Sequence, residues 1–141
     1  MSQFIEFVGN NALMFVALAA ILGMIAYTEY QRLFSGTVQL SVPEAVRLQN
    51  DDNAVFVDVR EVNEFKSGHI IDSKNHPLSS FDKNLAQLDK HKTAPVIVYC
   101  ATGARSNRAC AKLRKKEFAS VYNLAGGISA WEKANLPLVT K

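Results

Sequence analysis

One stretch, residues 95–106, constrains the fold most, because a strand pattern there gives way to a helix pattern across a cysteine. Residues 96–99 are apolar and mostly β-branched, as in a strand covered on both faces of a parallel sheet. Cys100 follows at once, and Gly103 permits a tight turn before an amphipathic segment begins at Ser106. The stretch predicts a strand–loop–helix unit with Cys100 at the carboxyl edge of the sheet.

Such a loop favours a reactive thiol. Amides at a helix N-terminus point toward an anion, and the guanidinium of Arg105 adds positive charge, so both favour the nucleophilic thiolate of Cys100. A lone cysteine is more often a small buried hydrophobe. Cys110, which lies in the following helical segment, fits that description. The strand end, glycine, arginine and helix start that surround Cys100 favour an active-site loop instead.

The chain beyond residue 36 alternates between the two patterns. Strands are expected at residues 37–40, 55–59, 69–71, 95–99 and 120–123, and helices at residues 41–49, 61–66, 80–90, 106–117 and 128–134. Alternation of this kind predicts an α/β domain with a mainly parallel sheet and helices on both faces. The segment of a little over a hundred residues can bury a core without disulfides.

Several short motifs occur together in a fixed order. They are Asp58-Val59-Arg60, Glu64, Gly68-His69-Ile70, Cys100-X-X-Gly103-X-Arg105-Ser106 and Gly126-Gly127-Ile128-X-X-Trp131. Between about residues 38 and 139 the sequence resembles a single rhodanese domain, and the whole chain resembles the membrane-anchored single-domain rhodanese-like proteins of bacteria. The resemblance implies a rhodanese-like mainly parallel sheet with helices on both faces, preceded by one transmembrane helix.

The resemblance also implies sulfur transfer. The Cys100 thiolate would take the sulfane sulfur of thiosulfate, a polysulfide or a protein persulfide, and pass it to a thiol or to cyanide, without a metal or an organic cofactor. The persulfide would be held by the loop residues Ala101, Thr102, Gly103, Ala104 and Arg105, and the supporting residues would be Asp58, Arg60 and Glu64. His69 belongs to the family's structural turn.

Two departures from the family pattern bear on the substrate and on a turn. Family members that favour thiosulfate tend to carry basic residues after the cysteine, where this chain has Ala101 and Thr102. We therefore expect thiosulfate to be a poor donor and a polysulfide or protein persulfide to be the better one. The usual turn after Gly68-His69-Ile70 is replaced by residues 71–74, and Asp72 there can adopt left-handed backbone angles.

Two other functions stay open. A phosphatase or arsenate reductase of related fold also uses cysteine and arginine, but its loop generally has five residues between them, and Ala101 to Ala104 are four. A membrane-tethered binding or redox-sensing module without turnover is also compatible with these motifs, because a sequence does not show a sulfur donor or acceptor. Mild net charge, +3, gives no support for nucleic-acid binding beyond the basic run of residues 112–116. That run fits a solvated helix end better than a lipid or acidic-partner contact.

The N-terminal segment carries no charge from Phe7 to Thr28, and Ala12 to Tyr27 is apolar apart from Gly23. A helix of this length spans roughly 33 Å, enough for a hydrocarbon core. A cleaved signal peptide would carry a basic n-region, and a buried core helix would show a polar face. The sequence lacks both features, and we expect a transmembrane anchor at residues 1–30, a linker at 31–36 and the rhodanese domain at 37–141.

Flanking charges predict the orientation of this anchor. No Lys or Arg precedes the apolar segment, whereas Arg32 follows it closely. The positive-inside rule then predicts that the domain lies in the cytoplasm, on a single-pass protein of the inner membrane. We expect the catalytic domain to be monomeric.

Overall fold

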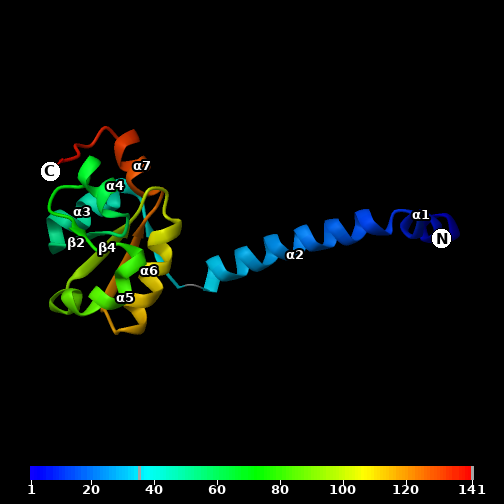
Figure 1. The fold of residues 1–141 in the computed structure, drawn as a ribbon, viewed down its shortest axis with the longest axis horizontal. Coiled ribbons are helices and arrows are strands. Elements are labelled where there is room, and N and C mark those ends of the chain that lie inside the picture. Colours follow the sequence, from blue (N-terminus) through cyan, green and yellow to red (C-terminus); the bar gives the residue numbers. More distant parts are fainter. Residues whose placement is uncertain (35, 141) are drawn as a thin grey trace. The chain divides into compact units, whose positions relative to one another are not determined.

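The computed structural model describes residues 1–34 and 36–140. Contacts divide the chain into two compact units, Met1–Gly36 and Thr37–Lys141. Figure 1 shows their helices and strands, labelled where there is room, with colours that follow the sequence from blue to red. Each unit is described by itself.

The first unit consists of two helices, α1 (Ser2–Asn10) and α2 (Ala12–Phe34). Asn11 separates them, and its side-chain amide donates to the carbonyl of Phe7 at 2.9 Å, which caps the end of α1. The stretch Ala12–Tyr30 has a mean hydropathy of 1.9, none of it is buried, and it is long enough to cross a membrane. The sequence predicted a single helix through the uncharged segment 7–28. The structure has a break at Asn11, and α2 ends at Phe34, inside the predicted linker 31–36.

The second unit is built on a parallel sheet of five strands in the order β1-β5-β4-β2-β3. The strands are β1 (Val38–Leu40), β2 (Val55–Asp58), β3 (Lys74–Asn75), β4 (Pro95–Tyr99) and β5 (Ser120–Leu124). The helices are α3 (Val42–Asp52), α4 (Val62–Ser67), α5 (Phe81–Asn84), α6 (Ala104–Lys115) and α7 (Gly127–Lys133), with 3₁₀ turns η1 (Leu78–Ser80) and η2 (Leu85–His91). The predicted α/β fold is confirmed.

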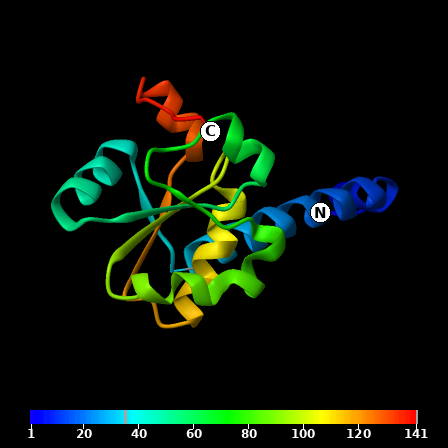
Figure 2. The same cartoon turned by 60° about the vertical axis from the view of Figure 1, so that its left-hand side comes forward.

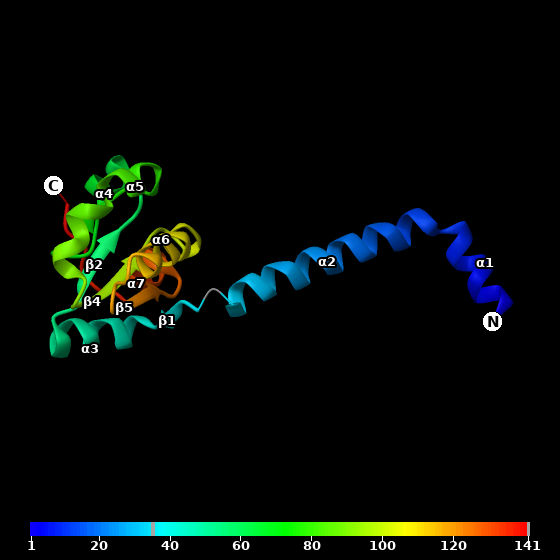
Figure 3. The same cartoon turned by 90° about the horizontal axis from the view of Figure 1, so that it is seen from below.

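Helices cover both faces of this sheet, with α3 on one side and α5 and α6 on the other (Figures 2 and 3). Alternate residues of β4 show why, since Val96 and Val98 pack with the helix α6, and Ile97 and Tyr99 pack with α3 and α7. All four are at most 1% exposed. A continuous apolar run is therefore what a central strand between two cores requires.

The structure differs from the expected elements at two places. The extended segment predicted at residues 69–71 makes only an isolated bridge between His69 and Val139. The edge strand of the sheet is instead β3, Lys74–Asn75. Two polar residues at a sheet edge carry no hydrophobic period, so only their pairing with β2 reveals them. The predicted helix at 80–90 is a short α5 followed by the 3₁₀ turn η2.

Candidate active site

Cys100 lies at the centre of the carboxyl edge of the sheet, because β4 is the third of its five strands. The loop after it turns at Gly103, whose φ of 105° is rarely adopted by other residues, and α6 begins at Ala104. The amide of Gly103 donates to the sulfur of Cys100 at 3.0 Å. The strand end and the helix start thus wrap one short loop around the thiol.

Hydrogen bonds make Cys100 more acidic than its burial alone would allow. Burial raises the pKa of this thiol, but the hydroxyl of Ser106 and the amides of residues 102, 103 and 106 lower it by more. The pKa of Cys100 therefore lies below its ordinary value of 9.0. Burial is the largest cause that acts on Cys110 and raises its pKa to about 12, so Cys110 stays a thiol at neutral pH.

The turn at residues 126–128 contacts the backbone of the Cys100 loop. Gly127 has a φ of 60°, and the amides that follow it, those of Ile128 and Ser129, donate to the carbonyls of Cys100 at 2.8 Å and Ala101 at 3.2 Å. A Cβ on Gly127 would collide with the carbonyl oxygen of Cys100. The loop can take this path only because residue 127 has no side chain.

The predicted loop cation, Arg105, is held by Glu64. Two nitrogens of its guanidinium each lie 3.0 Å from an oxygen of the Glu64 carboxylate. Glu64 sits on α4, so the pair ties α4 to the start of α6. Glu64 is the largest cause that raises the pKa of Arg105, and the charge of Cys100 adds a smaller contribution.

We expect this ion pair to give stability that depends on pH. Hydrogen bonds from Arg105 are the largest cause that lowers the pKa of Glu64, from 4.5 to about 2. The stabilisation is therefore complete above pH 4.5 and is lost as the pH falls toward 2. Both side chains are over a third exposed, so Glu64→Gln should lower the free energy of unfolding by at most about 1 kcal/mol at neutral pH.

Denaturant titration of the wild type and of Glu64→Gln from pH 7 to pH 2 would measure this difference. Lys112→Gln, which breaks a separate pair with Asp82, provides a surface control. A difference between wild type and Glu64→Gln that grows as the pH falls would contradict the assignment.

The other two predicted supporting residues form a buried pair beside the loop. Asp58 is fully buried at the end of β2, and its carboxylate lies 2.7 Å from a guanidinium nitrogen of Arg60. The same nitrogen of Arg60 donates to the carbonyl of Gly68 at 2.7 Å. Asp58 also pairs in register with Tyr99, the residue before Cys100. These contacts fix the 68–70 turn against the strand that carries the cysteine.

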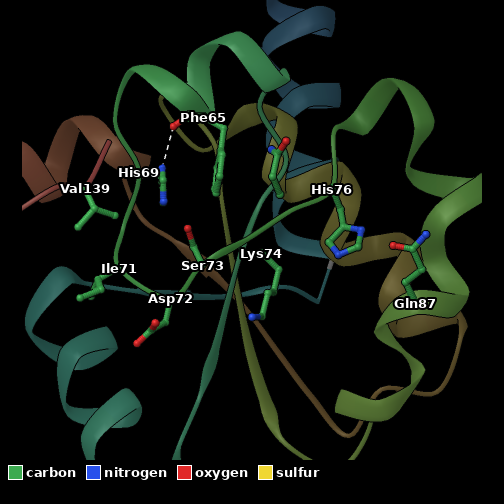
Figure 4. A pocket seen from close by; sticks show the side chains of 10 residues that line it. Phe65, His69, Ile71, Asp72, Ser73, Lys74, His76, Gln87 and Val139 are labelled. Atoms are coloured by element: carbon green, nitrogen blue, oxygen red, sulfur yellow. Dashed lines mark hydrogen bonds between the residues drawn. The ribbon is translucent and has the colours of Figure 1, made fainter. Parts of the chain in front are cut away.

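Two of the histidines share one cavity. His69 and His76 line a cavity of about 520 Å³ whose other lining residues include Phe65, Lys74 and Gln87 (Figure 4). The ring of His69 stacks on Phe65 with centroids 3.7 Å apart, and its Nδ1 lies 2.8 Å from the carbonyl of Phe65. None of the predicted loop residues lines this cavity. Within residues 1–34 and 36–140, no group of His, Cys, Asp and Glu could hold a metal ion.

Sequence reasoning missed three contributors to the loop. Ser106 contacts the sulfur of Cys100 at 3.4 Å, Asn123 binds both Ser106 and Gly103, and Gly127 lies against the loop backbone. Ser106 and Gly127 were part of motifs but had no assigned role. Asn123 had one available signal, since a side-chain amide in a predicted strand must find partners when it is buried.

Comparisons with known proteins identify the family. The model of the rhodanese-like domain matches residues 41–134. The chain is a member of the rhodanese-like domain family. It is 36% identical over 140 residues to the uncharacterized protein YibN of Escherichia coli (strain K12), covering 99% of this chain and 98% of that protein.

Two further relatives of this rhodanese-like protein carry names that state an activity. It is 34% identical over 96 residues to the thiosulfate sulfurtransferase GlpE of Shewanella oneidensis, covering 68% of this chain and 93% of that one. The solution structure of the polysulfide-sulfur transferase homodimer from Wolinella succinogenes matches with a TM-score of 0.67 and 29% identity, over 82% of this chain and 89% of that one. Together they support sulfurtransferase activity in general.

Proposed function

We propose that this rhodanese-like protein carries a sulfane sulfur on Cys100 as a persulfide. The observation that supports this most is the convergence of loop donors on one sulfur whose pKa is lowered despite its burial. In the first half-reaction the Cys100 thiolate attacks the outer sulfur of a persulfide RSS⁻, the bond to RS breaks, and RS⁻ leaves with its electron pair. An acceptor thiolate or cyanide then takes the sulfur and restores Cys100.

The amides of the loop residues are proposed to stabilise the anionic persulfide. Donors fixed in advance around a developing charge stabilise it without reorganisation, as in an oxyanion hole. The supporting residues Asp58, Arg60 and Glu64 would act on this loop from outside, through Tyr99, the 68–70 turn and Arg105. They would set the position of the loop without touching the sulfur.

We propose a polysulfide or a protein persulfide as the better donor. Thiosulfate carries a sulfonate group, whose charge calls for a cation near the cysteine. The residues between Cys100 and Arg105 are uncharged, and the guanidinium of Arg105 is engaged by Glu64. The names of the two relatives include both donor types. The values of kcat/KM with polysulfide and with thiosulfate decide between them, and we expect the larger value with polysulfide.

Mass spectrometry of the protein after incubation with polysulfide tests the persulfide directly. The peptide that contains Cys100 is expected to gain the mass of one sulfur atom, and cyanide should remove it. The peptide with Cys110 should stay unmodified, because burial raises the pKa of that thiol to about 12. A Cys100 peptide that stays unmodified would favour a binding or redox-sensing module without turnover.

We further propose that residues 12–30 anchor the protein in the inner membrane, with residues 37–141 in the cytoplasm. Support comes from the length and mean hydropathy of Ala12–Tyr30, which has no part buried in the protein. Arg32 follows this segment, and no Lys or Arg precedes it, which favours the cytoplasmic side for the domain.

Removing residues 1–36 is expected to give a soluble monomeric domain that keeps its sulfur transfer, because both cores and the loop lie downstream. Sedimentation with lipid vesicles at physiological salt measures membrane attachment of the two forms. Co-sedimentation of the truncated form would count against a single anchor, and would direct attention to the basic residues 112–116.

A further inference from the structure

Ser106 lies between the sulfur of Cys100 and the side-chain amide of Asn123. Its Oγ is 3.4 Å from Cys100 Sγ and 2.5 Å from Asn123 Oδ1. Ser106 is fully buried and Asn123 is 2% exposed, so bulk water supplies no substitute partner for either group. A hydroxyl has one proton, and Ser106 can therefore donate to only one of its two neighbours at a time.

Contacts of the other amide atom fix which end of Asn123 faces Ser106. Nδ2 donates to the carbonyl of Gly103 at 3.1 Å and to Oε1 of Gln39 at 3.0 Å. A backbone carbonyl only accepts, so the reversed amide would set two oxygens against each other. Oδ1 of Asn123, which has no proton, therefore faces Ser106 and competes with the sulfur of Cys100 for the hydroxyl proton.

We propose that Asn123 and Ser106 form a two-position proton switch that follows the charge on Cys100. In the thiol state the S–H of Cys100 donates to Ser106 Oγ, and Ser106 donates to Asn123. In the thiolate state Ser106 turns its proton to the sulfur, and Oδ1 of Asn123 loses its partner. Asn123 is a positioning residue, since it acts on the sulfur only through Ser106.

The switch has a consequence for the sulfur-transfer step, and this inference rests on the proposed role of Cys100. When the thiolate attacks RSS⁻, the new S–S bond forms at Sγ, RS⁻ leaves, and the negative charge moves to the outer sulfur. Sγ then no longer needs a donor, so the proton of Ser106 returns to Asn123. The pair thus favours the persulfide over the free thiolate.

The pKa of Cys100 in two variants of the full chain tests the switch. The measurement is the pH dependence of alkylation, with the modified peptide assigned by mass spectrometry. Ser106→Ala removes a donor to the thiolate and should raise the pKa of Cys100 by about one. Asn123→Leu removes the competing acceptor and should lower it by about one, and the double variant should match Ser106→Ala.

Opposite shifts are the signature of the switch. If Asn123 only held the loop in place, both variants would loosen the amide bonds to the sulfur and raise the pKa of Cys100. Gln39→Leu is the matched control, because the exposed Gln39 contacts Nδ2 of Asn123 and not Ser106, and it should leave the pKa of Cys100 unchanged. A raised pKa in Asn123→Leu overturns the proposal.

Asn123→Ala keeps the test decisive if Asn123→Leu does not fold, because it removes the same acceptor without adding bulk. It should also lower the pKa of Cys100. An unchanged or raised pKa in Asn123→Ala would overturn the switch. The titration needs no turnover, so sulfur transfer that survives in Cys100→Ser would count against the proposed function and leave the switch to be judged by the pKa alone.

Discussion

Cys100→Ser is expected to lower sulfur transfer from polysulfide to cyanide by about a thousandfold or more, to the rate without protein. The reason is chemical, since a serine hydroxyl cannot carry the sulfur as a stable persulfide. The fold should remain intact, because serine is nearly the same size and can still accept the hydrogen bond from the amide of Gly103. Steady-state assays and circular dichroism of the full chain measure both properties.

Cys110→Ser is the matched control for this replacement. Cys110 is fully buried, and its thiol lies 3.5 Å from the carbonyl of Tyr122. The variant should keep most of its activity and lose about 1 to 2 kcal/mol of stability from burying a hydroxyl. Equal losses of activity in the two variants would contradict the assignment of Cys100 as the nucleophile.

Gly127→Ala adds a single methyl group and is expected to lower both the stability of the domain and its kcat/KM. The new methyl group would collide with the carbonyl oxygen of Cys100 and lie 2.7 Å from the carbonyl carbon and oxygen of Ala101. Left-handed backbone angles at residue 127 add about 1 to 2 kcal/mol for any residue with a Cβ. We expect a loss of about 2 to 4 kcal/mol in stability and at least about a hundredfold in kcat/KM.

The same change at Gly23 provides the control. A Cβ on Gly23 meets no atom within 4 Å, so Gly23→Ala should leave both stability and kcat/KM close to the wild type. Thermal unfolding and steady-state kinetics with polysulfide compare the two variants. Wild-type kcat/KM in Gly127→Ala would show that the 126–128 turn does not set the position of the Cys100 loop.

The local patterns of the chain were enough to predict its fold class. Four apolar residues before Cys100 indicate a central strand, and alternation of strand and helix patterns over residues 37–134 indicates a parallel sheet with two covered faces. Such signals depend on neighbours in the sequence, because the hydrophobic period and the turn residues are local properties. The edge strand Lys74–Asn75 lacks a period and escaped prediction.

Local patterns show that Cys100 follows a buried strand and precedes a helix, which favours a reactive thiol in a loop of four residues before Arg105. The surroundings of that thiol depend on tertiary contacts. Asn123 reaches Ser106 from the neighbouring strand, and Gly127 closes the loop from the next turn. The physical reason is that each of these contacts joins residues 17 or more positions apart, where no local period or spacing specifies a partner.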